Sequence, residues 1–190
     1  MTGGPRCRAL SPGMLIAAAV TALWSGQVQA RQTVTFAGVG PVRLGMTAAE
    51  AERALNVRLK KQEGISGDNE KLCWIGARSD GIEPGIFYLI ERGKITRIDV
   101  DAIASVPKGV VPAATTAAGI GINSTENQIR QAYGGKVRAT ENTDAGVGVT
   151  WMTVRSPDKR RGINFQIVDG RVTSLWTAMY PAILYYEGCL

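Results

Sequence analysis

The sequence predicts an α+β fold: two tandem units, each a helix followed by antiparallel strands, that share one continuous sheet with the helices on one face. The first observation behind this prediction is self-similarity. Shifted by 77 residues, the segment 74–100 falls on 151–177 without a gap. A fixed-period match of this kind is typical of a duplicated structural unit. The identical pairs are Trp74/Trp151, Arg78/Arg155, Ser79/Ser156, Gly85/Gly162, Ile86/Ile163, Ile90/Ile167, Gly93/Gly170 and Thr96/Thr173.

The second observation is a pair of helix-start signals upstream of these segments. Thr47 with Glu50, and Thr125 with Gln128, each form a capping-box pattern, in which a hydroxyl and a side chain three residues later satisfy helix-start N–H groups. Helical spacing of apolar residues follows in both copies. These positions are Ala51, Ala54 and Leu55 in the first copy and Ile129, Ala132 and Tyr133 in the second, with Asn56 and Gly134 as terminators.

Alternating patterns after each helix predict the strands. Arg92-Gly93 and Asp169-Gly170 are tight hairpin turns, because these residue pairs tolerate the backbone of a two-residue turn. The predicted strands are 57–61, 72–78, 85–90 and 94–101 in the first unit, 136–140, 148–155, 163–168 and 171–178 in the second, and a last strand over 182–187.

The N-terminal 30 residues have the three parts of an export signal. Arg6 and Arg8 precede an apolar run over 14–23, and cleavage is expected near Ala30. The remaining chain then divides into a first repeat over 31–106, a linker over 107–118 and a second repeat over 119–190. We therefore expect a periplasmic or secreted protein with neither a membrane span nor a lipid anchor.

Cysteine usage agrees with export. Cys73 and Cys189 remain after signal cleavage, and an even count in an oxidising compartment favours a disulfide between them. Closing a loop of that length stabilises a fold by roughly 4–5 kcal/mol in the chain-entropy model. Two free thiols or an intermolecular bridge are the alternatives.

Several motifs resemble known families. The Gly-Pro-Val-Arg-Leu-Gly-Met-Thr-x-x-Glu run at 40–50 resembles the opening of the small lipoprotein of the outer-membrane barrel-assembly machinery. Two such units in tandem resemble the secreted beta-lactamase inhibitory proteins. The whole mature chain, through Glu187-Gly188-Cys189, is also similar to a family of uncharacterised bacterial exported proteins. These resemblances imply the tandem fold and an inhibitor-like binding role.

Strand alternation predicts which sheet face is open, because successive side chains point to opposite faces. We expect Ile75, Ala77, Met152, Val154 and Cys73 to face the core. A repeated Trp and Arg would then lie on the open face, where such residues are typical of interface hot spots. The alternative is that the tryptophans fill a core. The residues expected on the open face are Trp74, Arg78, Trp151, Arg155, Trp176, Asn164 and Gln166, with Thr153, Phe87, Leu89, Arg97, Asp99 and Asp101 beside them.

The residue types argue against catalysis. The chain has no histidine, which removes histidine-based triads and histidine metal sites. Asp99 and Asp101 share a strand face, but such a pair is more often a solvated or salt-bridged edge. We therefore expect no enzyme, no cofactor and no metal.

The formal net charge is +6, and removal of Arg6 and Arg8 with the signal leaves 20 basic against 16 acidic residues, a mild excess of +4. The basic cluster Lys159-Arg160-Arg161 is expected in a hairpin loop, where a solvated loop is the ordinary interpretation and an anionic envelope component is the alternative. Nucleic-acid binding needs more basic surface than this. The first hypothesis is thus a non-catalytic extracytoplasmic protein that binds a protein partner, in the manner of an inhibitor. The alternatives are a cell-envelope structural or assembly factor, and a carbohydrate-binding or hydrolytic domain.

Overall fold

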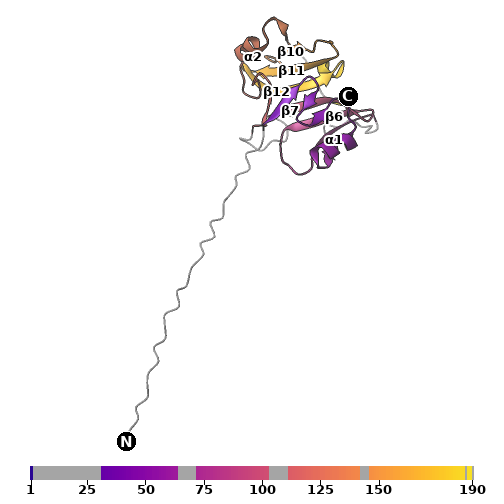
Figure 1. Cartoon of the computed structure of the whole chain (residues 1–190). Coiled ribbons are helices and arrows are strands. Elements are labelled where there is room, and N and C mark those ends of the chain that lie inside the picture. Colours follow the sequence, from indigo (N-terminus) through magenta and orange to yellow (C-terminus); the bar gives the residue numbers. More distant parts are fainter. Residues whose placement is uncertain (2–30, 64–71, 103–110, 142–145, 187, 190) are drawn as a thin grey trace.

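Two antiparallel-rich sheets dominate the computed structural model, which describes residues 1, 31–63, 72–102, 111–141, 146–186, 188 and 189 (Figure 1). The large sheet has eight strands in the order β4-β5-β6-β7-β12-β11-β10-β9, every neighbouring pair antiparallel. Its strands are β4 (Leu59–Lys61), β5 (Cys73–Arg78), β6 (Ile86–Glu91), β7 (Lys94–Asp101), β9 (Val137–Glu141), β10 (Thr150–Arg155), β11 (Arg161–Val168) and β12 (Arg171–Met179).

A second sheet of four short strands, in the order β3-β2-β1-β8, lies against the large one. The pairing of β1 with β8 is parallel and joins segments that are far apart in the sequence. β8 lies inside the segment 107–118 that the sequence predicts as a linker. The strands of this small sheet are β1 (Gln32–Thr35), β2 (Gly38–Val39), β3 (Val42–Arg43) and β8 (Ala114–Thr116).

The predicted fold class, two helix-plus-sheet repeats, is wrong. In the described part of the chain the α-helices are α1 (Ala48–Leu55) and α2 (Glu126–Tyr133), each only eight residues long, and strands make up far more of the structure than helices do. The small sheet has no counterpart in that prediction. Its strands of two to four residues are too short to show alternation, and the β1–β8 pairing is long-range, so local patterns do not reveal it.

Most individual strand predictions agree with the structure to within two residues, and both two-residue hairpins form as expected. The last predicted strand, 182–187, is wrong. Residues Ala182–Leu184 form the short 3₁₀ helix η2, and Glu187 lies outside the described residues, as does the expected export signal over 2–30. No helix among the described residues is long and apolar enough to cross a membrane.

Both capping boxes are confirmed. Thr47 and Thr125 are the N-caps of α1 and α2, and in each case the side-chain oxygen accepts from the backbone N–H three residues on while that residue's side chain accepts from the cap N–H. Both helices present their apolar residues to the same core, through Ala51 and Leu55 of α1 and Ile129 of α2. Helices this short depend on their caps and on this packing.

Thr125→Ala is expected to lower the free energy of unfolding by about 1 kcal/mol, because the helix-start N–H groups lose their acceptor. Thr125→Ser keeps the hydroxyl and should stay close to wild type. Urea unfolding followed by circular dichroism measures both. Equal losses in the two variants would show that the methyl group, and not the cap, carries the effect.

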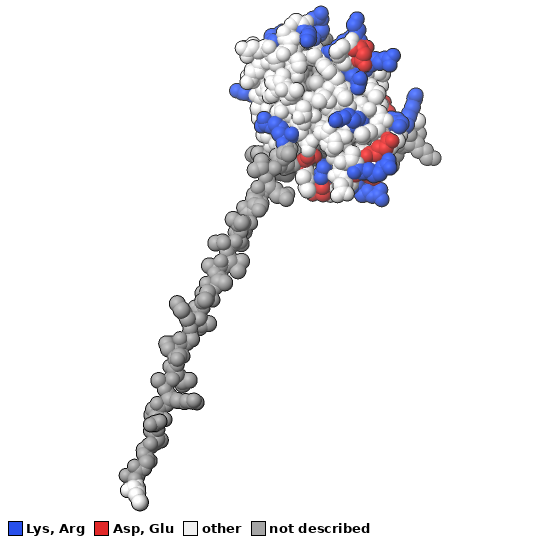
Figure 2. Space-filling view, in the orientation of Figure 1, with Lys and Arg blue, Asp and Glu red and all other residues white. Residues whose placement is uncertain are grey.

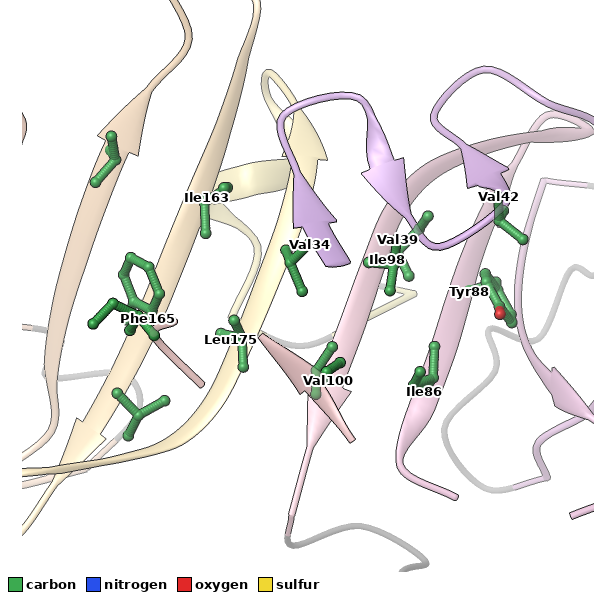
Figure 3. Close-up of a cluster of buried hydrophobic side chains, with 14 of the residues drawn as sticks. Val34, Val39, Val42, Ile86, Tyr88, Ile98, Val100, Ile163, Phe165 and Leu175 are labelled. Atoms are coloured by element: carbon green, nitrogen blue, oxygen red, sulfur yellow. The ribbon is translucent and has the colours of Figure 1, made fainter. Parts of the chain in front are cut away.

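The main core lies between the two sheets. Val34, Val39 and Val42 of the small sheet face Ile98 and Val100 of the large one (Figure 3). Phe165 and Leu175 are fully buried in the same cluster. Trp74, from β5, packs against this cluster and therefore lies on the covered side of the large sheet.

The opposite side of the large sheet, here called the tryptophan face, carries Trp151 and Trp176. It is covered by the described residues 181–186, 188 and 189, here called the C-terminal strap, in which Ala182 and Ile183 pack against the two tryptophans. Cys73 and Cys189 form the predicted disulfide across 116 residues of sequence and hold the end of the strap in place. Both faces of the large sheet are thus covered over its central strands, whereas the β9 end of the tryptophan face stays exposed.

Candidate functional site

Of the seven predicted binding residues, three are buried and three are half-buried. Trp151, Trp176 and Asn164 are 7%, 1% and 0% exposed, so none of the three can meet a partner without rearrangement. The indole N–H of Trp176 donates to Ile183 O at 3.0 Å, and the two tryptophan rings meet edge to face with centroids 5.1 Å apart. Trp151 and Trp176 therefore fill a core, which is the alternative that the sequence left open.

The prediction that Trp74 and Arg78 share a face with Trp151 and Arg155 is wrong. In the β5–β6 hairpin Trp74 lies opposite Ile90, whereas in the β10–β11 hairpin Trp151 lies opposite Gln166. The two registers differ by one residue, and a one-residue slip turns every side chain of a strand to the other face. Ile75 and Ala77, expected in the core, therefore contribute to the cluster on the tryptophan face, as does Cys73.

Arg78 and Gln166 are both engaged within the protein. Arg78 donates to both carboxylate oxygens of Asp80, at 3.1 and 2.8 Å, and lies 3.5 Å from Glu83. The hydrogen bonds from Arg78 keep the pKa of Asp80 below its usual value. Gln166 is half-buried, and its side-chain oxygen lies 3.4 Å from the indole nitrogen of Trp151. Neither residue presents a free surface.

Arg155 is the predicted site residue that the structure leaves exposed. Its guanidinium lies over the ring of Tyr180, 4.7 Å from the centroid, at the end of β10. Four further exposed cations surround this point, on β9, on the turn before it and on the β10–β11 loop. We call these five residues the cationic rim: Lys136, Arg138, Arg155, Lys159 and Arg160.

The members of the cationic rim line three neighbouring hollows that have lining residues in common. Arg138 and Arg155 line two of them, and Lys159 and Tyr180 each line two as well. Figure 2 shows Lys and Arg atoms gathered along the top of the molecule, over the α2, β10 and β11 end of Figure 1, with little acidic surface among them. Among the described residues, no ion pair within 4.0 Å joins the rim to a carboxylate.

The β10–β11 loop is ordered by its one acidic residue. Asp158 accepts from the Ser156 hydroxyl at 2.5 Å and from Arg160 N–H at 3.1 Å, and it pairs with Arg161 at 3.3 Å. These contacts, the Ser156 bond foremost, lower the pKa of Asp158 to about 2. Since the charge of Asp158 is matched by Arg161, it leaves Lys159 and Arg160 uncompensated on the loop.

Asp158→Asn is expected to make the stability of the fold less dependent on pH between 3.8 and about 2. A carboxyl whose pKa falls from 3.8 to about 2 on folding stabilises the fold above 3.8, and that contribution is lost as the pH falls toward 2. Thermal unfolding midpoints at pH 5, 4, 3 and 2.5 compare the variant with wild type. Parallel curves for the two proteins would contradict this role of Asp158.

The most apolar of the three hollows lies where the core reaches the rim. Its volume is about 560 Å³, within the range of small-ligand pockets. Its floor is Val154, a core residue, and its walls include the half-buried rings of Phe36 and Tyr133. Four rim cations stand around it: Lys136, Arg138, Arg155 and Lys159.

A separate hollow lies beside α1, and its lining carries charges of both signs. Its lining includes Glu52, Arg53 and Arg58, and Arg58 pairs with Glu52 at 2.9 Å. Opposite charges there satisfy each other. Among the described residues, no cluster of three or more Asp, Glu, Cys or His side chains is placed to hold a metal ion.

No family model and no curated protein sequence matches this chain. One solved structure aligns with it: an extracellular protein containing an SCP domain from Bacillus anthracis, at 5% identity and a TM-score of 0.35. The alignment covers 74% of this chain and 45% of that one.

Sequence reasoning found part of the site. It identified Arg155 and the Lys159-Arg160-Arg161 cluster, and it named an anionic envelope component as one possible ligand of that cluster. It did not identify Lys136 and Arg138 as members. No local motif marks these two residues. They lie near the β10–β11 loop because β9 pairs with β10, with Arg138 opposite Thr153.

Proposed function

We propose that the protein is an extracytoplasmic, non-catalytic binding protein that holds an anionic ligand against the cationic rim. The observation that supports this most is the rim itself: five exposed cations line three hollows that have lining residues in common, and the one acid among them is already paired within its own loop. Clustered charge of one sign raises the local concentration of oppositely charged ligands and speeds their association.

The extracytoplasmic setting is supported by the disulfide. Cys73–Cys189 is a structural bridge that fastens the C-terminal strap, and bridges of this kind persist in oxidising compartments. Export through the segment 1–30, with cleavage near Ala30, is part of the same proposal. It accounts for an N-terminal segment whose sequence has the parts of a signal.

The test compares two variants with the same change of charge. One loses rim cations, Lys136→Gln/Arg155→Gln/Lys159→Gln; the control loses exposed cations elsewhere, Arg43→Gln/Arg53→Gln/Lys94→Gln. Binding of the purified, oxidised protein to immobilised dextran sulfate is measured at several NaCl concentrations, with neutral dextran as the blank.

The rim variant is expected to bind at least about tenfold more weakly, a loss of ~1.4 kcal/mol, and with a shallower salt dependence. The control variant should stay within about twofold of wild type by the same relation. Equal weakening of both variants would mean that net charge alone drives binding, and the proposed site would be withdrawn.

A further inference from the structure

We infer that the hollow bounded by Phe36, Tyr133 and Val154 binds a small amphiphilic anion, an apolar body that carries one phosphate or carboxylate group. This inference rests on the proposed function and deepens it, because it names the class of ligand. The hollow joins two chemistries in one enclosure: an apolar floor continuous with the core, and a surrounding set of cations.

The apolar part of the enclosure is built into the fold. Val154 is 2% exposed and belongs to the core between the sheets. Tyr133, at the end of α2, has its ring 5.8 Å from that of Phe165, which fixes it against the same core. Burial raises the pKa of the Tyr133 phenol, as expected for a ring in apolar surroundings. An apolar body placed here would be removed from water on one side by core residues, and such burial is favourable in proportion to its area.

The polar part of the enclosure is cationic. Arg138 is held near the turn by donating to Gly135 O at 3.0 Å, and Arg155 is held by its stacking on Tyr180. Lys159 has a left-handed backbone, φ +59°, in the loop that the Asp158 contacts order. The guanidinium groups of Arg138 and Arg155 and the backbone of Lys159 are thus placed before any ligand arrives, so an anionic head group would meet positive charge with little reorganisation of these groups. Charge-assisted bonds from Arg and Lys to phosphate or carboxylate oxygens are among the stronger hydrogen bonds.

A neutral apolar ligand would leave the surrounding cations without a partner, and a small inorganic anion would leave the floor unused. An amphiphilic anion satisfies both surfaces. The hollow holds about 560 Å³, the size of a small-molecule pocket, and the proposal commits to a free molecule as the source of the ligand.

Octyl phosphate, inorganic phosphate and octanol are the probes, each titrated into the oxidised wild-type protein by calorimetry. We expect octyl phosphate to bind at least about tenfold more tightly than inorganic phosphate, with octanol below detection, because burial of several methylene groups adds to the charge contacts. Equal binding of octyl phosphate and inorganic phosphate would overturn the inference while leaving the proposed function intact. Absence of binding to both phosphates and to dextran sulfate would remove the proposed function as well.

Gly135→Trp tests the position of the ligand without altering a charge. Gly135 lines the hollow and is exposed, and a β-carbon added to it would meet no atom within 4 Å, so a bulky residue there can fill the enclosure without displacing core atoms. Gly135→Ala is the matched control. The Trp variant should weaken octyl phosphate binding at least about tenfold, and the Ala variant should match wild type. Unchanged octyl phosphate binding in Gly135→Trp would overturn the inference, as would tight retention on phosphatidylglycerol vesicles that neither variant alters.

Discussion

Replacing Cys73 and Cys189 together by serine is expected to lower the free energy of unfolding by roughly 4–5 kcal/mol. The bridge closes a loop of 116 residues, and in the chain-entropy model its main effect is to restrict the unfolded chain. Within the fold, the bridge also holds the strap beside Ile75 and Leu89 on the tryptophan face. Urea unfolding followed by tryptophan fluorescence measures the loss.

The wild-type protein in reductant is the control, and it should unfold at the same urea concentration as the double serine variant. The variant itself should not respond to reductant. A loss below about 1 kcal/mol would contradict the prediction and would show that the packing of the strap holds it without the bridge.

Arg97→Met is expected to lower the free energy of unfolding by about 3 kcal/mol, because it leaves the carboxylate of Asp99 without its partner in a little-exposed site. Arg97 Nε donates to Asp99 Oδ1 at 2.7 Å, and Arg97 Nη1 donates to Tyr185 O of the strap at 2.6 Å. The guanidinium also lies over the Trp176 ring, 4.2 Å from its centroid. One side chain thus links the sheet, the strap and a buried tryptophan.

The double variant Arg97→Met/Asp99→Leu separates the charge from the packing. It should recover most of the lost stability, because an apolar pair in place of a buried ion pair is often neutral or stabilising. Burial raises the pKa of Asp99, and Arg97 opposes that rise. In the single variant the folded protein therefore takes up a proton more readily than the unfolded chain, so the deficit should shrink as the pH falls from 7 toward 4. A deficit that is independent of pH, and that persists in the double variant, would contradict this role of the ion pair.

Local elements were the most predictable part of this fold. Capping boxes and hairpin turns depend on a few neighbouring residues, and α1, α2 and the hairpins at 92–93 and 169–170 follow from them. The bulges in the two hairpins also fall at equivalent places, between Leu89 and Ile90 and between Gln166 and Ile167. The two hairpins are therefore alike in structure at the positions that the sequence repeat makes equivalent.

The same self-similarity failed for β5, for a physical reason. A face is set by register, and register depends on the loop that joins the strands as well as on their sequences. The loop between β5 and β6 spans 79–85, whereas that between β10 and β11 spans 156–160. The hairpins they close differ by one residue in pairing, which places Trp74 and Trp151 on opposite faces.

The covering of the tryptophan face was also beyond local patterns. The end of the chain has the sequence pattern of a strand, but Trp176 donates its N–H to Ile183 O, and Arg97 donates to Tyr185 O, so the segment lies across the sheet as a strap. Neither contact belongs to a local sequence motif. Because the strap covers Trp151 and Trp176, the candidate site lies at the cationic rim and not at the tryptophans.

Backbone and indole NMR shifts of the ¹⁵N-labelled, oxidised protein during titration with octyl phosphate test the central claim most directly. We expect the amide signals of Gly135, Arg138 and Lys159 to move with a common dissociation constant, while the indole signals of Trp151 and Trp176 stay fixed under the strap. Movement of both indole signals with no change at the rim would contradict the claim, because the ligand would then lie on the tryptophan face.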